Sequence, residues 1–71
     1  MDQIEKLAQL VPHWIEHNEA HAAQFAEWSE RALEAGLTEV AGSLAEAANA
    51  LVRANESLEL ARGGLAEGDS Q

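Results

Sequence analysis

Apolar residues recur along the first half of the chain in alternating steps of four and three. In an α-helix this spacing places the side chains on one stripe. The stripe comprises Ile4, Leu7, Val11, Trp14, Asn18, His21, Phe25, Trp28, Ala32 and Ala35. We therefore predict a helix over about residues 2–35, with Asp2 and Glu5 forming a capped start.

Pro12 lies off this stripe, and the spacing runs through it without a slip. Proline removes a helical hydrogen bond and bends the helix where it occurs. The preferred interpretation is thus a kinked but continuous helix. The alternative is a break, in which Pro12 opens a second helix after a short N-terminal one.

The second half has a more regular heptad pattern, in which leucines alternate with small residues. The repeat consists of Leu37, Leu44, Leu51, Leu58 and Leu65, with Val40, Ala47, Ala54 and Ala61 three positions later. Gly36 is suited to closing the first helix, because glycine readily adopts the left-handed conformation. We predict a turn at 36–38, a helix over about 38–62 that stops at Gly63-Gly64, and a frayed tail over 65–71.

These elements predict an all-α fold, a two-helix antiparallel hairpin that forms a single domain over residues 1–64. Ala41 and Ala48 widen the second stripe beyond what one partner helix covers. A chain of 71 residues without cysteine has a marginal core and no disulfide to reinforce it. We therefore expect a homodimer that forms a four-helix bundle, with a different protein partner as a further possibility.

The formal net charge is −9, from 13 acidic and four basic residues. Such a chain repels phosphate backbones, so we expect neither nucleic acid nor a membrane as its partner. A secretory signal pattern and an apolar run of membrane-spanning length are both missing from the sequence. The expected location is the cytoplasm.

Folding the hairpin at Gly36 and Leu37 makes facing residue numbers add up to about 73. Asn18 then lies opposite Asn55, and His17 lies opposite Glu56. His21 faces Leu51. A polar layer is thereby predicted inside an otherwise apolar stripe, which is unusual because an unpaired buried polar group costs about 1–3 kcal/mol.

The three histidines of the chain, at positions 13, 17 and 21, recur every four residues. Histidines four apart on a helix can bind one metal ion through both rings. The first hypothesis is therefore a small metal-binding protein for carriage, storage or sensing, with His17 and His21 as ligands and His13 or Glu56 as the third. Two imidazoles and a carboxylate suit Zn²⁺, Ni²⁺, Co²⁺ or Fe²⁺.

The second hypothesis is an oligomerisation or protein-interaction module that binds no ligand and whose Asn18 and Asn55 layer sets the register. A third interpretation is a pH-sensing cluster, because imidazole changes charge between about pH 5 and 8. Trp14, Phe25 and Trp28 serve as core, or as a partner surface if the chain stays monomeric. The sequence holds no arrangement typical of catalysis, and we expect the protein not to be an enzyme.

Overall fold

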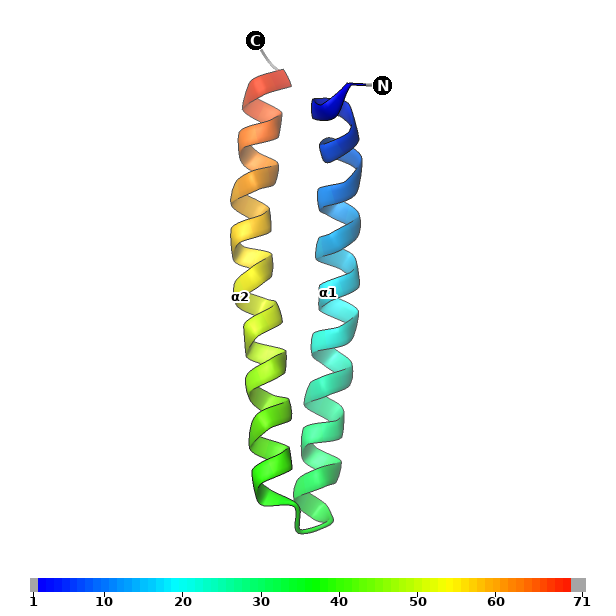
Figure 1. Cartoon of the computed structure of the whole chain (residues 1–71), viewed down its shortest axis with the longest axis vertical. Coiled ribbons are helices and arrows are strands. Elements are labelled where there is room, and N and C mark those ends of the chain that lie inside the picture. The colour runs from blue at the N-terminus through cyan, green and yellow to red at the C-terminus, as the bar shows by residue number, and fades with distance from the viewer. Residues whose placement is uncertain (1, 70–71) are drawn as a thin grey trace.

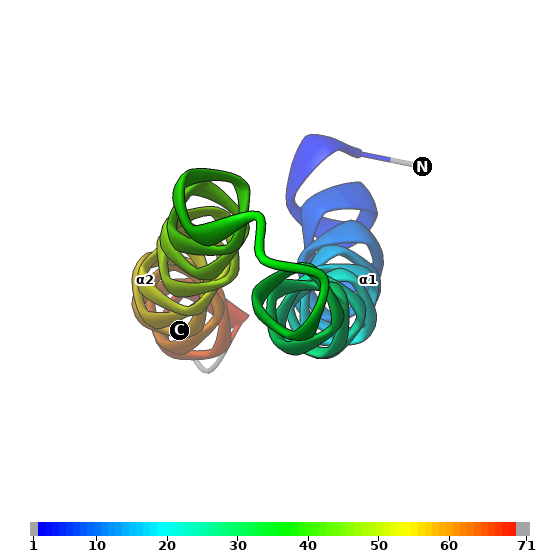
Figure 2. The ribbon, with the colours of Figure 1, turned by 90° about the horizontal axis from the view of Figure 1, so that it is seen from below.

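The computed structural model describes residues 2–69 and consists of two long helices, α1 (Gln3–Glu34) and α2 (Thr38–Asp69). The helices run antiparallel, so that the start of α1 and the end of α2 lie at the same end of the hairpin (Figure 1). Figure 2 looks along the bundle from the turn and shows the two helices side by side. The predicted all-α hairpin is confirmed, and the residues described contain no strand.

Local chemistry explains where α1 starts and stops. The Asp2 carboxylate accepts a hydrogen bond from the Glu5 backbone N–H at 2.8 Å, which satisfies one of the free donors of the first turn. At the other end Gly36 has a φ of +83°. Its N–H donates to the Leu33 carbonyl at 3.0 Å, and the Leu37 N–H donates to the Ala32 carbonyl at 2.9 Å. This pair of bonds is a Schellman cap.

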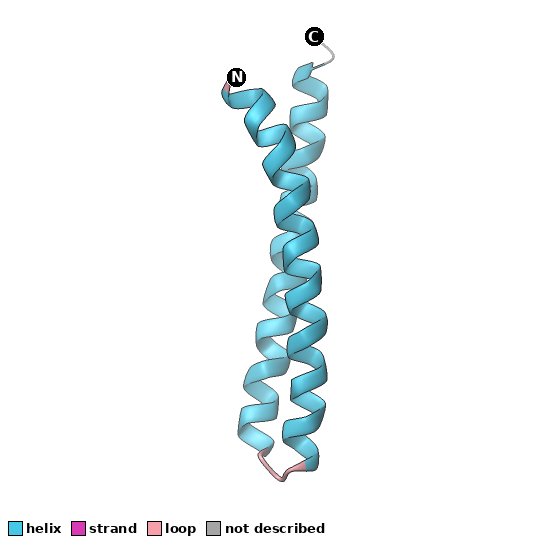
Figure 3. Cartoon of the chain, turned by 90° about the vertical axis from the view of Figure 1, so that its right-hand side faces the viewer, coloured by secondary structure: helices cyan, strands magenta, loops and turns pink. Residues whose placement is uncertain are grey.

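Pro12 lies inside α1, which is continuous, so the alternative of a helix break is wrong. The N-terminal turns of α1 lean away from α2 (Figure 3). A proline bends a helix in this way because it lacks an N–H and its ring collides with the carbonyl four residues earlier.

The second helix is longer than predicted. It continues through Gly63 and Gly64 to Asp69, so the expected end near Arg62 and the frayed tail from residue 65 are wrong up to Asp69. Residues 70–71 of that predicted tail lie outside the described part of the chain. Leu65 is half-buried and extends the leucine heptad beyond the glycines. Its packing favours the helix over the local preference of glycine.

The core is thin, and its most buried residues are few and mostly small: Val11, Ile15, Ala32, Ala41 and Ala48. The Ser29 hydroxyl donates to the Ala41 carbonyl at 2.7 Å and ties the helices together near the turn. The molecule measures 54 × 17 × 12 Å and has a radius of gyration of 16.1 Å. A compact domain of this length has a radius of gyration of roughly 11 Å, so the hairpin is markedly elongated.

Over the described residues, neither helix combines the length and the apolar character needed to cross a bilayer.

Candidate functional site

An amide pair links the two helices at mid-height, where the sequence predicts a polar layer. The Asn18 side-chain Nδ2 donates to Asn55 Oδ1 at 3.0 Å. Asn55 Nδ2 in turn donates to the Ile15 backbone carbonyl, also at 3.0 Å. Both amides are half-buried. Because each bond requires one height of α1 against α2, the pair defines the register of the hairpin.

The three histidines form a row along one flank of α1. The ring centroids of His13 and His17 are 6.4 Å apart, and those of His17 and His21, which meet edge to face at 77°, are 4.5 Å apart. Phe25 continues the row, with its ring centroid 5.8 Å from that of His21. His21 Nε2 lies 3.0 Å from His17 Nε2, so one ring donates a hydrogen bond to the other. His21 Nδ1 is buried and has no hydrogen-bond partner.

The predicted metal site is wrong. Across the part of the chain that the structure describes, no three His, Asp or Glu side chains are grouped so that they could hold an ion. His17 and His21 use their Nε2 atoms on each other. Glu56, the proposed third ligand, belongs to a groove on the opposite flank of the hairpin. Glu56 lies level with His17 along the length of the hairpin, but on the opposite flank.

That groove is open and has a volume of about 470 Å³. Its walls combine apolar side chains with three carboxylates: Ile15, Glu19, Ala22, Val52, Asn55, Glu56 and Glu59. The sequence pattern did not single out Glu19 and Glu59. Their signal is weak, because glutamates on an acidic helix are usually solvated and only the pairing of the two helices brings them together.

The flank that carries the histidines is apolar. Each residue turns a helix by about 100°, and this rotation gathers one set of side chains from both helices on that flank. We call this set the apolar face: Leu10, Trp14, His21, Phe25 and Trp28 of α1, with Val40, Ala47, Leu51, Ala54 and Leu58 of α2. Trp14 is 41% exposed and Trp28 is 50% exposed, so neither tryptophan belongs to the core of the single chain.

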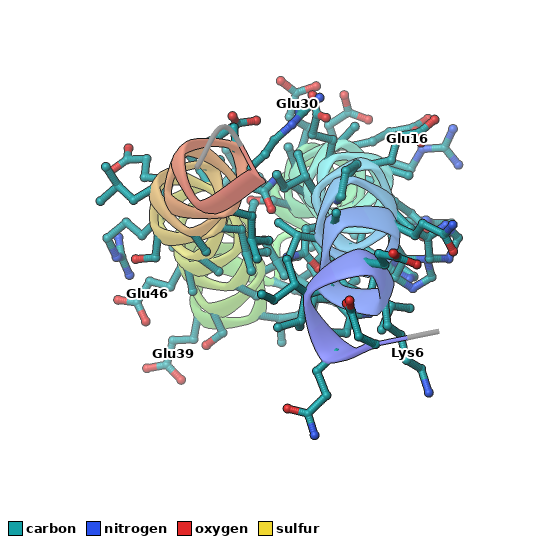
Figure 4. All side chains as sticks on the ribbon, turned by 90° about the horizontal axis from the view of Figure 1, so that it is seen from above. Lys6, Glu16, Glu30, Glu39 and Glu46 are labelled. Atoms are coloured by element: carbon teal, nitrogen blue, oxygen red, sulfur yellow. The ribbon has the colours of Figure 1, made fainter. Side chains whose placement is uncertain are left out.

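Acidic residues are absent from the apolar face within the described chain. The six glutamates of α1 all fall within an arc of about 80° on the other side of that helix. In Figure 4, seen along the bundle, Glu16 and Glu30 point away from this flank, and Glu46 points away behind α2. Lys6 and Glu39 lie at its two outer borders. Arg31 lies on the same border as Lys6, and its Cζ atom is 4.7 Å from the centre of the Trp28 ring. The carboxylates of α1 thus lie on the flank opposite the apolar face.

Comparison with known proteins identifies a family. Residues 7–65 match DUF8180, described as a domain of unknown function. The chain belongs to the DUF8180 family. The matched DUF8180 segment includes the row of three histidines, the Asn18 and Asn55 pair and both tryptophans. No curated protein and no solved structure matches the chain.

Proposed function

We propose that this DUF8180 chain is a self-association module, in which two copies pair through their apolar faces to form a four-helix bundle. The role is architectural: the bundle joins copies of the chain, or whatever is attached to them, and it carries out no reaction. The observation that supports this most directly is the apolar face itself, a large surface without carboxylates on a chain of net charge −9.

The amount of exposed surface supports a partner of matching size. The hairpin exposes 5311 Å² at a mass of 7.6 kDa. A folded monomer of that mass exposes roughly 4,300 Å², so about 1,000 Å² is in excess. Specific protein interfaces bury about 800 Å² on each partner. One interface of ordinary size would therefore bring the chain to the exposure of a compact protein.

Charge supports a second copy as the occupant. Two chains of net charge −9 repel each other unless they meet where carboxylates are missing, and the apolar face is such a place. A two-fold axis parallel to the helices would place α1 of each copy over α2 of the other. The border with Arg31, which pairs with Glu27 of its own helix at 2.8 Å, would then lie beside the border with Glu39 of the second copy. Lys6 lies at the opposite end of the hairpin from Glu39, so the support for a second copy comes from the missing carboxylates.

Two glutamate substitutions on α2 test the proposal. Ala54 lies on the apolar face, whereas Asn49 lies outside it, and both are exposed in the single chain. Ala54→Glu and Asn49→Glu each add one negative charge to the same helix. Analytical ultracentrifugation should give the wild type a mass of about twice 7.6 kDa. Ala54→Glu should raise the dimer dissociation constant at least tenfold, about 1.4 kcal/mol, because it buries an unpaired carboxylate.

Asn49→Glu is the control for the added charge, and it should leave the dissociation constant close to that of the wild type. A wild-type chain that stays monomeric at high micromolar concentration would refute self-association. A dimer that both substitutions weaken equally would show that the two copies meet elsewhere than on the apolar face.

A further inference from the structure

The hydrogen bond between His17 and His21 limits how many protons the two rings can hold. Two neutral imidazoles carry two N–H hydrogens on four nitrogens. With the two Nε2 atoms 3.0 Å apart, only one of them can hold a hydrogen, because the other must accept. The neutral pair meets this condition when His21 Nε2 donates, His17 Nδ1 carries the second hydrogen, and the buried His21 Nδ1 stays bare.

Adding one proton to the neutral His17–His21 pair costs free energy wherever the proton is placed. Three hydrogens on four nitrogens, with one Nε2 still accepting, require both Nδ1 atoms to be protonated. His21 Nδ1 would then carry an N–H in a buried position where it has no acceptor. The only escape is to break the bond between the two rings and turn His21 toward water. Either way, protonation disrupts the present arrangement of the pair.

The surroundings of His21 offer no carboxylate that could stabilise an imidazolium. On α1 its ring neighbours are His17 and Phe25, with His13 one turn further along, and the glutamates Glu16 and Glu19 point to other sides of the helix. On α2 the facing positions are Leu51, Ala54 and Leu58, none of which is charged. Glu56 and Glu59 lie in the groove on the opposite flank.

In the single chain His21 is half-buried, so its ring can rotate out to water. A second copy seated on the apolar face would close that exit. Its own apolar face carries no acid, and its Glu39 would lie on the outer border near the turn, away from the height of His21. We infer that protonation of the His17–His21 pair separates the two copies, so that the bundle assembles at neutral pH and dissociates in mild acid. This inference rests on the proposed self-association and adds its regulation.

Total charge works in the opposite direction. Protonation of all three histidines changes the formal net charge from −9 to −6, which weakens the repulsion between copies. If net charge governed assembly, acid would strengthen the dimer. Weakening in acid therefore points to the His17–His21 pair and the buried Nδ1 of His21.

Sedimentation equilibrium at about pH 7.5 and about pH 5.5 tests the inference, because imidazole changes charge between these values. The wild-type dissociation constant should rise at least tenfold at the lower pH. The double substitution His17→Gln/His21→Gln removes both titrating rings but keeps polar side chains, and should hold the change below about threefold. His13→Gln is the matched control, because His13 is exposed outside the apolar face, and should respond to pH as the wild type does.

Circular dichroism at both pH values checks that each variant keeps its helices. If the double variant loses helicity, His21→Leu replaces it and should dimerise at both pH values. A wild type that is monomeric at about pH 7.5 would refute the proposed function itself. A wild-type dimer whose dissociation constant is the same at both pH values would refute only the switch. A double variant that dissociates in acid as steeply as the wild type would do the same.

Discussion

At the scale of single residues, the Asn18 and Asn55 pair makes the alignment of the two helices specific. Leucines and alanines at heptad spacing allow a helix to slide by a turn with similar packing, whereas an amide pair does not. Asn55 also donates to the Ile15 carbonyl, so a slip would leave several polar groups without partners. The amide pair therefore contributes both to the stability of the hairpin and to the specificity of its register.

A double-mutant cycle measures the contribution of this pair to stability. Asn18→Ala and Asn55→Ala should each lower the free energy of unfolding by about 1 kcal/mol, the usual value of a partly buried hydrogen bond. The double variant should lose less than the sum, with a coupling energy of about 0.5–1.5 kcal/mol in urea denaturation. Strictly additive losses would contradict a direct interaction between the two amides.

The sequence alone was sufficient to place Asn18 opposite Asn55, because a hairpin turn at Gly36 fixes the height of every residue on the facing helix. The same reasoning failed for His17 and Glu56. Height does not determine flank, and the two residues lie on opposite sides of the plane that contains both helix axes. The metal hypothesis depended on that missing coordinate. Rotation about each helix could have supplied it, since the glutamates of α1 cluster far from the histidines.

At the scale of elements, glycine plays different parts in the turn and in α2. Gly36 has a positive φ and closes α1, whereas Gly42, Gly63 and Gly64 are helical residues. Composition alone does not distinguish a glycine that ends a helix from one that lies within it. The deciding factor is the segment after the glycine: a new helix running back along α1 after Gly36, and another leucine of the heptad after Gly64.

Alanine substitutions at two glycines should therefore have opposite effects. At Gly36 a side chain is strained by the left-handed backbone, so Gly36→Ala should lower the free energy of unfolding by about 1 kcal/mol. At Gly42 an added methyl group meets open space in a helix, so Gly42→Ala should raise it by about 0.5–1 kcal/mol. Thermal or urea denaturation measures both. A gain at Gly36 would show that the turn does not depend on its positive φ.

At the scale of the whole molecule, the shape of the chain is the main argument about its role. A 54 Å hairpin of two helices has no third element among its described residues to cover the apolar face, and its core is built largely from alanines. The sequence pattern predicts this uncovered face, because the apolar stripe of α2 is wider than one partner helix covers. It did not reveal that the acidic residues would be confined to the other flank and the outer borders, and this arrangement is what makes a second copy an acceptable partner.

Folding and association should then be linked, so that stability depends on protein concentration. A partner that binds only the folded chain stabilises it by mass action. Each tenfold increase in concentration should raise the wild-type melting temperature by roughly 5 °C, given the small unfolding entropy of a domain of this size. Ala54→Glu should melt below the wild type at every concentration, because its weaker pairing adds less stability, while Asn49→Glu should follow the wild type. Circular dichroism melts across a hundredfold dilution measure this dependence. A wild-type melting temperature that does not change with concentration would mean that the hairpin is stable alone and that its apolar face remains open to a different partner.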